Sequence, residues 1–299
     1  MRGFLKIVAG AIVTALVCTA SNLRAKLKEE DTPAGPNHHV KEGSISTEEL
    51  VSLEKAAELY FQAQKGLRED YKLVAAEFTR VEANYPCVAG VIPLGGVSPD
   101  AVYDGHKYAC GIPHIYLEPI VYSFGSFKNQ FFEMDLLRLR PDAKVWIYEL
   151  DPKQVVPEAM QDSRVTYLDV GLGGYADEPF ATPEGWKMQS MGEMMTANGH
   201  PYIDVLKMDI EGGEYPFIRH EVDLLSRVGQ LLIEIHINAN TYANIGLVDF
   251  IDRIEARGLR LFHSEINIHR PFFCMEFSFV QSNWVEWNHK KTEIAALHG

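Results

Sequence analysis

The sequence predicts an α/β fold with a mainly parallel sheet that helices cover on both faces. From residue 116 onward, short apolar runs alternate with stretches of helical periodicity, which is typical of parallel strands joined by crossover helices. Acidic residues follow several of these runs directly, at the edge where such sheets bind ligands. The chain has 299 residues, of which 46% are hydrophobic, so it can bury a large core.

The expected elements follow in order along the chain. Strands are expected at 120–124, 144–148, 164–170, 203–209, 230–236, 260–263 and 274–280. Helices are expected at 131–137, from Pro152, at 192–198, between 209 and 225, and at 246–257. No helical pattern separates the last two strands, so we expect them to pair antiparallel.

The N-terminal part predicts three segments before this domain. Residues 1–20 join Arg2 and Lys6 to an apolar run, as in a cleaved signal peptide or a signal-anchor. Residues 21–46 are expected to be a flexible linker, because large apolar residues are sparse there. Residues 47–83 carry apolar residues at steps of three and four, which predicts an amphipathic helix. It could be a stem, a dimerising coiled coil, or a helix packed on the domain.

Charge and cysteines narrow the expected partners and the compartment. The formal net charge is -13 and no Lys/Arg-rich run is present, so nucleic acid is not an expected partner. The N-terminal segment predicts the secretory pathway, with the chain secreted or held as a single-pass membrane protein of the ER or Golgi type. Disulfides persist there, and we expect one between Cys87 and Cys110. The oligomeric state is left open.

Candidate binding residues follow the first two strands. Gly125, within Ser123-Phe-Gly-Ser126, allows a tight turn and a close approach to a ligand, although an ordinary strand-to-helix turn explains it equally well. Glu149 and Asp151 share one face after the second strand, where a carboxylate can hold ribose hydroxyls. The alternative for these two acids is a solvated pair before a helix.

Candidate catalytic residues follow the later strands. Asp209 emerges from an apolar strand, whereas Glu211 is also explained as an ordinary acid near a helix start. His236 ends the next strand, two residues after Glu234. A histidine beside carboxylates can act as a general base, and a buried structural histidine is the alternative.

Four segments in this order resemble the FkbM-type S-adenosylmethionine-dependent methyltransferases. They are Ser-Phe-Gly-Ser at 123–126, Glu-Leu-Asp-Pro at 149–152, Leu-Lys-Met-Asp-Ile-Glu-Gly-Gly-Glu-Tyr at 206–215, and Leu-Leu-Ile-Glu-Ile-His at 231–236. Within that family the chain is similar to the methyltransferase-like group with an N-terminal anchor. The resemblance implies a seven-stranded class I methyltransferase fold, with a methyltransferase domain at 84–285 and a C-terminal tail at 286–299.

The resemblance also implies which residues bind S-adenosylmethionine. Gly125 would lie against the methionine moiety, Asp151 or alternatively Glu149 would hold the ribose, and residues 169–170 would lie near the adenine. The full set of cofactor-binding residues that it implies is Ser123, Gly125, Ser126, Glu149, Asp151, Asp169, Val170 and Asp209.

The reaction implied by the resemblance is methylation of a hydroxyl on a small or sugar acceptor. A base must take the hydroxyl proton while the methyl carbon is held in line. The candidates are Asp209, Glu211 and His236, with Asp209 expected to position the acceptor and His236 to act as the base. The sulfonium is its own leaving group, so no metal is expected.

Two alternatives stay open from the sequence. A membrane anchor, a stem and Glu149-x-Asp151 after a strand also fit a glycosyltransferase whose carboxylates hold a divalent metal. A second alternative is a binding protein that keeps the fold without catalysis. Ser123 and Asn129 favour it, because they stand where the family has an acidic residue and a glycine.

Overall fold

The residues that the computed structural model describes belong to the unit Ala76–Gly299. The described residues are 81, 83–98, 101–102, 105–155, 161–176, 186–236, 245–267 and 274–298. The predicted signal or anchor segment, the linker and nearly all of the amphipathic helix lie outside them. Among the residues described, none of the helices has the length and apolar character that a membrane crossing requires.

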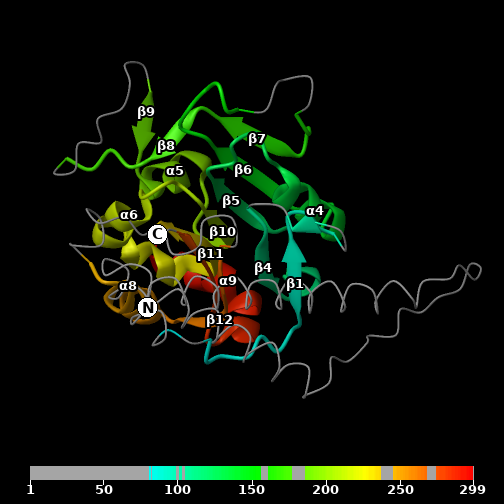
Figure 1. The fold of residues 1–299 in the computed structure, drawn as a ribbon. Helices are drawn as coiled ribbons and strands as arrows, with labels where there is room; N and C mark the ends of the chain where they lie inside the picture. The colour runs from blue at the N-terminus through cyan, green and yellow to red at the C-terminus, as the bar shows by residue number, and fades with distance from the viewer. Residues whose placement is uncertain are drawn as a thin grey trace, which may run out of the picture. The chain divides into compact units, whose positions relative to one another are not determined.

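A seven-stranded sheet organises these residues (Figure 1), in the order β12-β13-β11-β10-β5-β6-β7. Its strands are β5 (Ile120–Phe124), β6 (Lys144–Tyr148), β7 (Val165–Leu168), β10 (Ile203–Met208), β11 (Val228–His236), β12 (Leu259–Ile266) and β13 (Cys274–Gln281). Only β13 runs antiparallel to its neighbours within this sheet. The predicted mostly parallel sheet and the antiparallel last pair are therefore confirmed.

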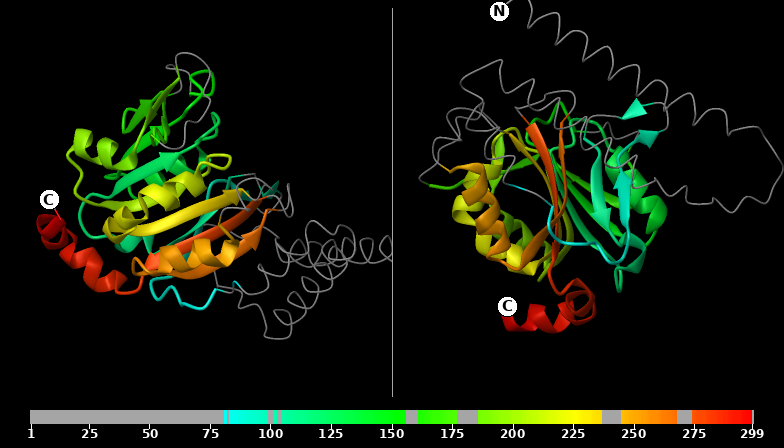
Figure 2. Two further views of the ribbon diagram at one scale, coloured as in Figure 1. Left: turned by 90° about the vertical axis from the view of Figure 1, so that its left-hand side faces the viewer. Right: turned by 60° about the horizontal axis from the view of Figure 1, so that its bottom comes forward.

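Helices and a hairpin cover the two faces of the sheet (Figure 2). The helices are α4 (Phe131–Leu139), α5 (Met191–Asn198), α6 (Glu214–His220), α8 (Leu247–Glu255) and α9 (Trp284–His298). Helices α6 and α8 contact each other on one face, and α4 contacts the hairpin strand β1 (Val91–Leu94) on the other. The helix expected to reach residue 225 ends at His220, and a 3-10 helix at Val222–Arg227 follows.

Two other expectations differ from the structure. Residues 152–155, expected to open a helix, form turns, and 156–160 lie outside the described residues. The third expected strand is interrupted after Leu168, because the chain leaves the main sheet there. It continues as β8 (Val170–Leu172), which pairs with β9 (Lys187–Gln189) in a separate two-stranded sheet.

The stretch around residues 87–110 contains a hairpin. Strand β1 pairs antiparallel with β4 (Lys107–Cys110), and a shorter pair, β2 (Val97–Ser98) with β3 (Ala101–Val102), lies between them in sequence. The predicted disulfide between Cys87 and Cys110 is confirmed. The side-chain amide of Gln230 on β11 accepts from the Cys110 N–H at 2.8 Å, which fixes the hairpin over the sheet.

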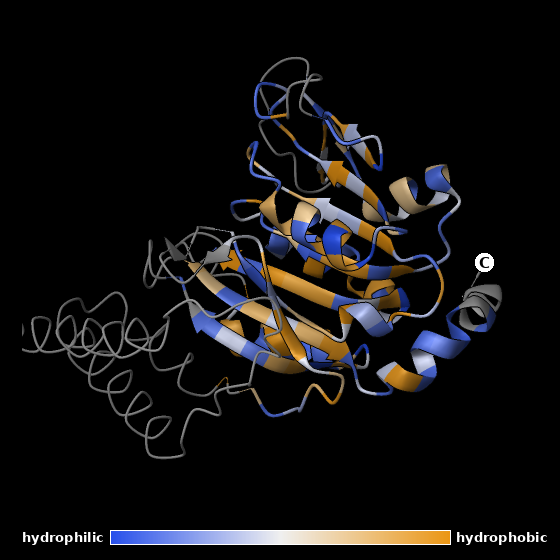
Figure 3. Ribbon diagram, turned by 90° about the vertical axis from the view of Figure 1, so that its right-hand side faces the viewer, coloured by the Kyte–Doolittle hydropathy of each residue, from blue (hydrophilic) through white to orange (hydrophobic). Residues whose placement is uncertain are grey.

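Apolar residues fill the middle of the sheet, as Figure 3 shows for the central strands. Val121, Val145 and Val205, on three adjacent strands, are almost fully buried in one cluster. Continuous burial of this kind is typical of parallel strands covered on both faces. Among the described residues of these strands, and apart from Asp204, charged side chains lie toward the carboxyl ends of β10 and β11 and toward the amino end of the antiparallel β13.

Helix α9 is attached by polar contacts inside the fold. Lys291 and Asp204 form an ion pair at 2.5 Å, and both side chains are buried. Asn288 accepts a hydrogen bond from the Tyr116 N–H and donates one to the carbonyl of His114, both at 2.8 Å. The segment from Trp284, expected to be a tail beyond residue 285, is therefore an integral helix of the described unit.

Candidate functional site

A cavity of about 510 Å³ opens at the carboxyl ends of β5, β6, β10 and β11. This volume lies in the range of about 300–1,000 Å³ that is usual for small-ligand sites. The predicted site residues that line it are Gly125, Ser126, Glu149, Asp151, Asp209, Glu211 and His236. The other predicted residues, Ser123, Asp169 and Val170, are not among its lining.

Gly125 lies where β5 and β10 approach each other most closely. Its φ is +76°, and a Cβ on it would lie 1.8 Å from the backbone oxygen of Asp209, so no other residue fits without moving the chain. The N–H of Asp209 donates to the carbonyl of Phe124 at 3.0 Å, and Nζ of Lys207 donates to the carbonyl of Gly125 at 2.5 Å. The turn after β5 is therefore fixed against the end of β10.

Glu149 holds this turn from the next strand. Its Oε2 accepts from the N–H groups of Ser126 at 3.0 Å and Phe127 at 2.8 Å, and Oε1 accepts from Asp151 N–H at 3.3 Å. Glu149 is buried, whereas Asp151 is partly exposed at the cavity and caps the N–H of Lys153. The two acids thus have different surroundings: Glu149 accepts hydrogen bonds from the loop backbone, and Asp151 lies at the cavity edge. We call Gly125–Phe127 with Glu149 and Asp151 the glycine-loop side.

The far end of this side differs from the expected adenine site. Asp169 is exposed and lies 3.8 Å from Lys187, outside the cavity. Its neighbour Val170 begins β8 and is likewise absent from the lining. The chain leaves the main sheet after β7, and other residues line the cavity at this end. The side chains and backbone that line this end are Gly171, Leu172, Trp186 and Met188.

Ser123 and Asn129, the departures from the family pattern, have defined partners. Ser123 is fully buried, and its hydroxyl donates to Oε1 of Glu133 on α4 at 2.5 Å. A carboxylate is therefore present beside the strand, supplied by the helix instead. Asn129 lines the cavity, and its Oδ1 accepts from the N–H of Phe131 at 3.0 Å.

Acidic residues occupy the same level on four adjacent strands. Glu234 pairs with Glu276 across β11 and β13, and Glu276 pairs with Glu265 across β13 and β12. Asp209 follows Met208, whose partner is Ile233, so Asp209 is level with Glu234. We call Asp209, Glu234, Glu276 and Glu265 the acidic row. Like charges directly opposite each other destabilise a sheet unless other groups compensate them.

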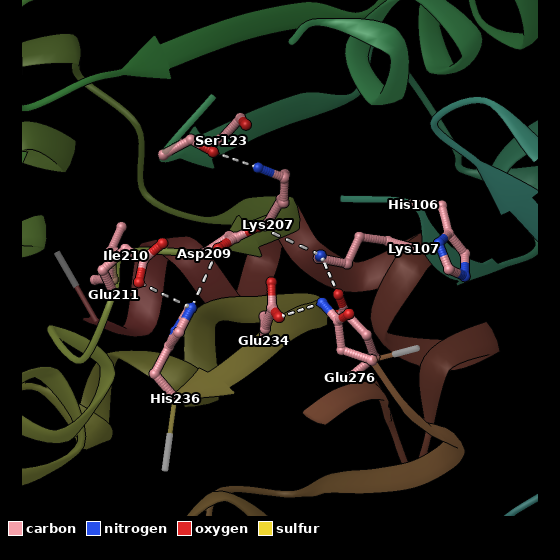
Figure 4. A network of polar contacts seen from close by, with 12 residues as sticks. His106, Lys107, Ser123, Lys207, Asp209, Ile210, Glu211, Glu234, His236 and Glu276 are labelled. Carbon is pink, nitrogen blue, oxygen red and sulfur yellow. Dashed lines mark hydrogen bonds and ion pairs between the residues drawn. The ribbon is translucent and has the colours of Figure 1, made fainter. Parts of the chain in front are cut away.

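Cations from the hairpin compensate the acidic row (Figure 4). Nζ of Lys107 lies 2.7 Å from Oε1 of Glu276 and 3.6 Å from Oδ2 of Asp209, although only 1% of the lysine is exposed. His106, the preceding residue, forms an ion pair with Glu265. The hairpin thus supplies buried charge as well as a cover for the sheet.

Burial and mutual repulsion shift the pKa values in the row in different directions. Burial raises the pKa of Glu276 to about 8, with Lys107 acting against it and the carboxylates of Glu234 and Asp209 adding to it. Burial and Asp209 also raise the pKa of Glu234. For Asp209 burial is outweighed by Lys107, Lys207 and His236, which lower its pKa. Asp209 is therefore the most readily ionised of these three.

His236 is held between carboxylates. Its Nδ1 lies 3.0 Å from Oε1 of Glu214, and its Nε2 lies 3.5 Å from Glu211 and 3.9 Å from Asp209. Glu214 is fully buried and accepts from the N–H groups of Ile210 and Gly212. Burial opposes a charge on His236, but hydrogen bonds to Cys274 and Glu214 raise its pKa to about 12. A general base needs an unprotonated ring, so this raised pKa does not favour that role for His236.

Sequence reasoning missed Lys107, Lys207, Glu276 and Cys274 as parts of one site. A charge inside an otherwise apolar strand is a usable signal for two of them, since Lys207 stands between Leu206 and Met208 and Glu276 lies in an apolar strand. Lys107 lies in a stretch that had no clear strand pattern, so its position could not be inferred.

Comparison with known proteins identifies the family of this chain. Residues 80–281, more than half of the chain, match a family described as a methyltransferase domain. The chain belongs to this methyltransferase family. A human protein named "Probable methyltransferase-like protein 24" is 28% identical over 117 residues, 32% of each chain. Its rat counterpart is 26% identical over 161 residues, which is 46% of this chain and 44% of the relative. The matches thus span less than half the length of these relatives.

Solved structures similar to this chain share little sequence identity with it. A Methanococcus jannaschii fibrillarin pre-rRNA processing protein has a TM-score of 0.38 and 10% identity, covering 56% of this chain and 68% of that one. Magnesium protoporphyrin IX methyltransferase from Synechocystis with bound SAH has a TM-score of 0.35 and 12% identity, covering 55% and 74%. The chain has the class I methyltransferase fold that was predicted, with the seven-stranded sheet described above.

Proposed function

We propose that the cavity binds S-adenosylmethionine and that the chain transfers its methyl group to a hydroxyl of a small or sugar acceptor. One observation carries this proposal: a single cavity joins the turn at Gly125, the acids after β6 and Asp209 at the end of β10. S-adenosylmethionine supplies an electrophilic methyl carbon on a sulfonium that also leaves. Membership of a methyltransferase family favours this reaction over the glycosyltransferase alternative.

The residues of the glycine-loop side fit this cofactor. Gly125 leaves the turn without a side chain, so a ligand can approach the backbone. Glu149 fixes the turn, and Asp151 at the cavity edge is the carboxylate that we assign to the ribose hydroxyls. Leu172 and Trp186 offer an apolar and aromatic wall suited to a purine ring.

Asp209 is the residue that we assign to the acceptor proton. Both ring nitrogens of His236 face carboxylates, Nδ1 toward Glu214 and Nε2 toward Glu211 and Asp209. A nitrogen that faces a carboxylate donates to it, so neither is placed to accept a proton from a substrate. In this assignment His236 positions Asp209 and Glu211, while Asp209 accepts the hydrogen bond of the acceptor hydroxyl. The sequence predicted the reverse, with Asp209 positioning the acceptor and His236 acting as the base.

The compartment and the partners are part of the same proposal. A disulfide between Cys87 and Cys110 suits an oxidising compartment, which supports the secretory pathway, with the chain either secreted or anchored through its N-terminal segment. The net charge of -13 and the acids of the cavity favour a small molecule or glycan as acceptor over a nucleic acid. The finer FkbM-type grouping stays a prediction from the sequence.

Calorimetric titration of the full chain with S-adenosylmethionine tests the cofactor assignment. We expect saturable binding that weakens at least about tenfold in Asp151→Ala, since a hydrogen bond to a charged group contributes about 1.5–3 kcal/mol. Asp169→Ala is the matched control, because that acid lies outside the cavity. If a folded chain binds neither S-adenosylmethionine nor S-adenosylhomocysteine, the non-catalytic alternative is the better description.

A further inference from the structure

Three side chains of different chemistry meet on the wall of the cavity. Glu234, His236 and Cys274 offer oxygen, nitrogen and sulfur atoms that all lie within 4.8 Å of one another, and all three residues are buried. His236 and Cys274 are direct partners across β11 and β13, and Glu234 lies two residues along β11 on the same face. The backbone of the central sheet thus fixes the spacing of these groups.

We propose that Glu234, His236 and Cys274 bind one divalent cation of the zinc class at the cavity wall. A thiolate with an imidazole favours zinc over the hard cations magnesium and calcium. Sites with three protein ligands keep a coordination position for water or substrate, and these three residues all line the cavity. No metal was expected from the sequence, because the sulfonium of the cofactor is its own leaving group. The three ligands come from two strands, so no short motif marks them.

The surroundings of His236 are those of a metal ligand. Metal-binding histidines typically give their other ring N–H to a carboxylate, which fixes the tautomer and the ring orientation. Glu214 does this at 3.0 Å from Nδ1 and is itself held by two backbone N–H groups. Glu234 is oriented similarly, because Nδ2 of Asn267 donates to its Oε1 at 2.7 Å. Two of the three ligands therefore have fixed orientations.

The charge balance at this end of the cavity favours a cation. Five carboxyl groups lie in this part of the fold with two lysines and His236 among them, so acidic groups outnumber basic ones by two, and the raised pKa values of Glu234 and Glu276 reflect this crowding as well as burial. The carboxylates are Asp209, Glu211, Glu214, Glu234 and Glu276, and the lysines are Lys107 and Lys207. A divalent cation would offset much of this excess where the effective dielectric constant is low. Its binding releases the protons that His236 and the Cys274 thiol otherwise hold.

Zinc titration of the metal-stripped full chain is the first test. The chain should carry His38→Gln and His39→Gln, because these adjacent histidines could bind zinc themselves. We expect one zinc per chain by calorimetry, and we expect cobalt(II) in its place to show a thiolate-to-metal charge-transfer absorption. Cys274→Ser should abolish that absorption and weaken zinc binding at least tenfold. Glu214→Gln should weaken it by about 10–100-fold through the orientation of His236.

Controls separate this site from other histidines and from misfolding. His263→Gln, on β12 beside Glu265, should leave zinc affinity and the cobalt spectrum unchanged. Cys274→Ser should unfold at the wild-type temperature when EDTA is present. Absence of zinc binding by the wild-type chain, or unchanged affinity in Cys274→Ser, would overturn the proposal. It does not depend on methyl transfer, because zinc is titrated without S-adenosylmethionine and the cofactor can be titrated in EDTA.

Discussion

The glycine-loop side and the acidic row line one cavity but are stabilised in different ways. On the glycine-loop side, Glu149 is satisfied by backbone N–H groups that lie no more than 23 residues away. In the acidic row, Glu276 depends on Lys107, which is 169 residues away in sequence. The hydrogen bonds of Glu149 thus come from strands that are consecutive in the chain, whereas the ion pair of Glu276 requires the complete sheet with its hairpin in place.

Removal of the Lys107 side chain should lower the unfolding free energy more than any other change proposed here, because Lys107 compensates the charges of the acidic row. Lys107→Met leaves buried carboxylates without their cation, and breaking such a pair costs about 3–5 kcal/mol of unfolding free energy. Urea unfolding measures this loss. Lys144→Met is the control, because its exposed pair with Glu118 contributes less than about 1 kcal/mol. Equal losses in the two variants would show that the row is not held by Lys107.

Gly125→Ala tests whether the glycine-loop side depends on a close backbone approach. The new Cβ would collide with the Asp209 carbonyl. We therefore expect the unfolding free energy to fall by about 1–3 kcal/mol and the affinity for S-adenosylmethionine to drop strongly. Gly199→Ala is a matched control, because Gly199 has a φ of +67° but no atom within 4 Å of its Cβ position. It should lose about 1 kcal/mol and bind the cofactor normally. Similar behaviour of both variants would contradict the steric explanation.

Glu149→Gln tests whether the charge of Glu149 stabilises the turn on the glycine-loop side. The amide oxygen can still accept hydrogen bonds, but the charge that strengthens them is lost, so we expect about 1–2 kcal/mol less stability. Hydrogen exchange of the Ser126 and Phe127 amides should accelerate. Unchanged protection of these two amides would show that another group holds the turn.

Glu265, at the edge of the acidic row, should give the smallest effect and a defined pH dependence. Burial opposes its charge, but the contacts with His106 and His263 lower its pKa to about 2. A depressed carboxyl pKa contributes stability above the unfolded value of about 4.3, and that stability is lost as the pH falls toward 2. After discounting for partial exposure, we expect Glu265→Gln to lose about 1 kcal/mol at pH 5.5.

Denaturant unfolding of wild type and Glu265→Gln at several pH values measures this difference. It should shrink steadily as the pH falls below about 4.3. A difference that stays constant down to pH 3 would mean that packing, and not the charge of Glu265, is responsible.

Most of the seven-stranded sheet was predictable, because its strands are local apolar runs, although the run at 164–170 spans the break between β7 and β8. The site was predictable only where strand ends mark it, as at Gly125, Glu149 and Asp209. Asp169 was a wrong position for the cavity wall, since the departure of β8 from the main sheet has no local signal. The partnership of Glu276 with Lys107 depends on the register of distant strands, which one sequence does not reveal.

Helix α9 has a practical consequence for anyone who expresses this domain. The family similarity ends at residue 281, three residues before α9 begins. A recombinant product cut at that boundary would lose Lys291 and leave the buried carboxylate of Asp204 without its cation. We expect such a product to aggregate or be degraded. A lack of activity in an assay would then reflect misfolding and not the catalytic ability of the protein. Boundaries drawn from similarity alone would thus discard part of the folding unit.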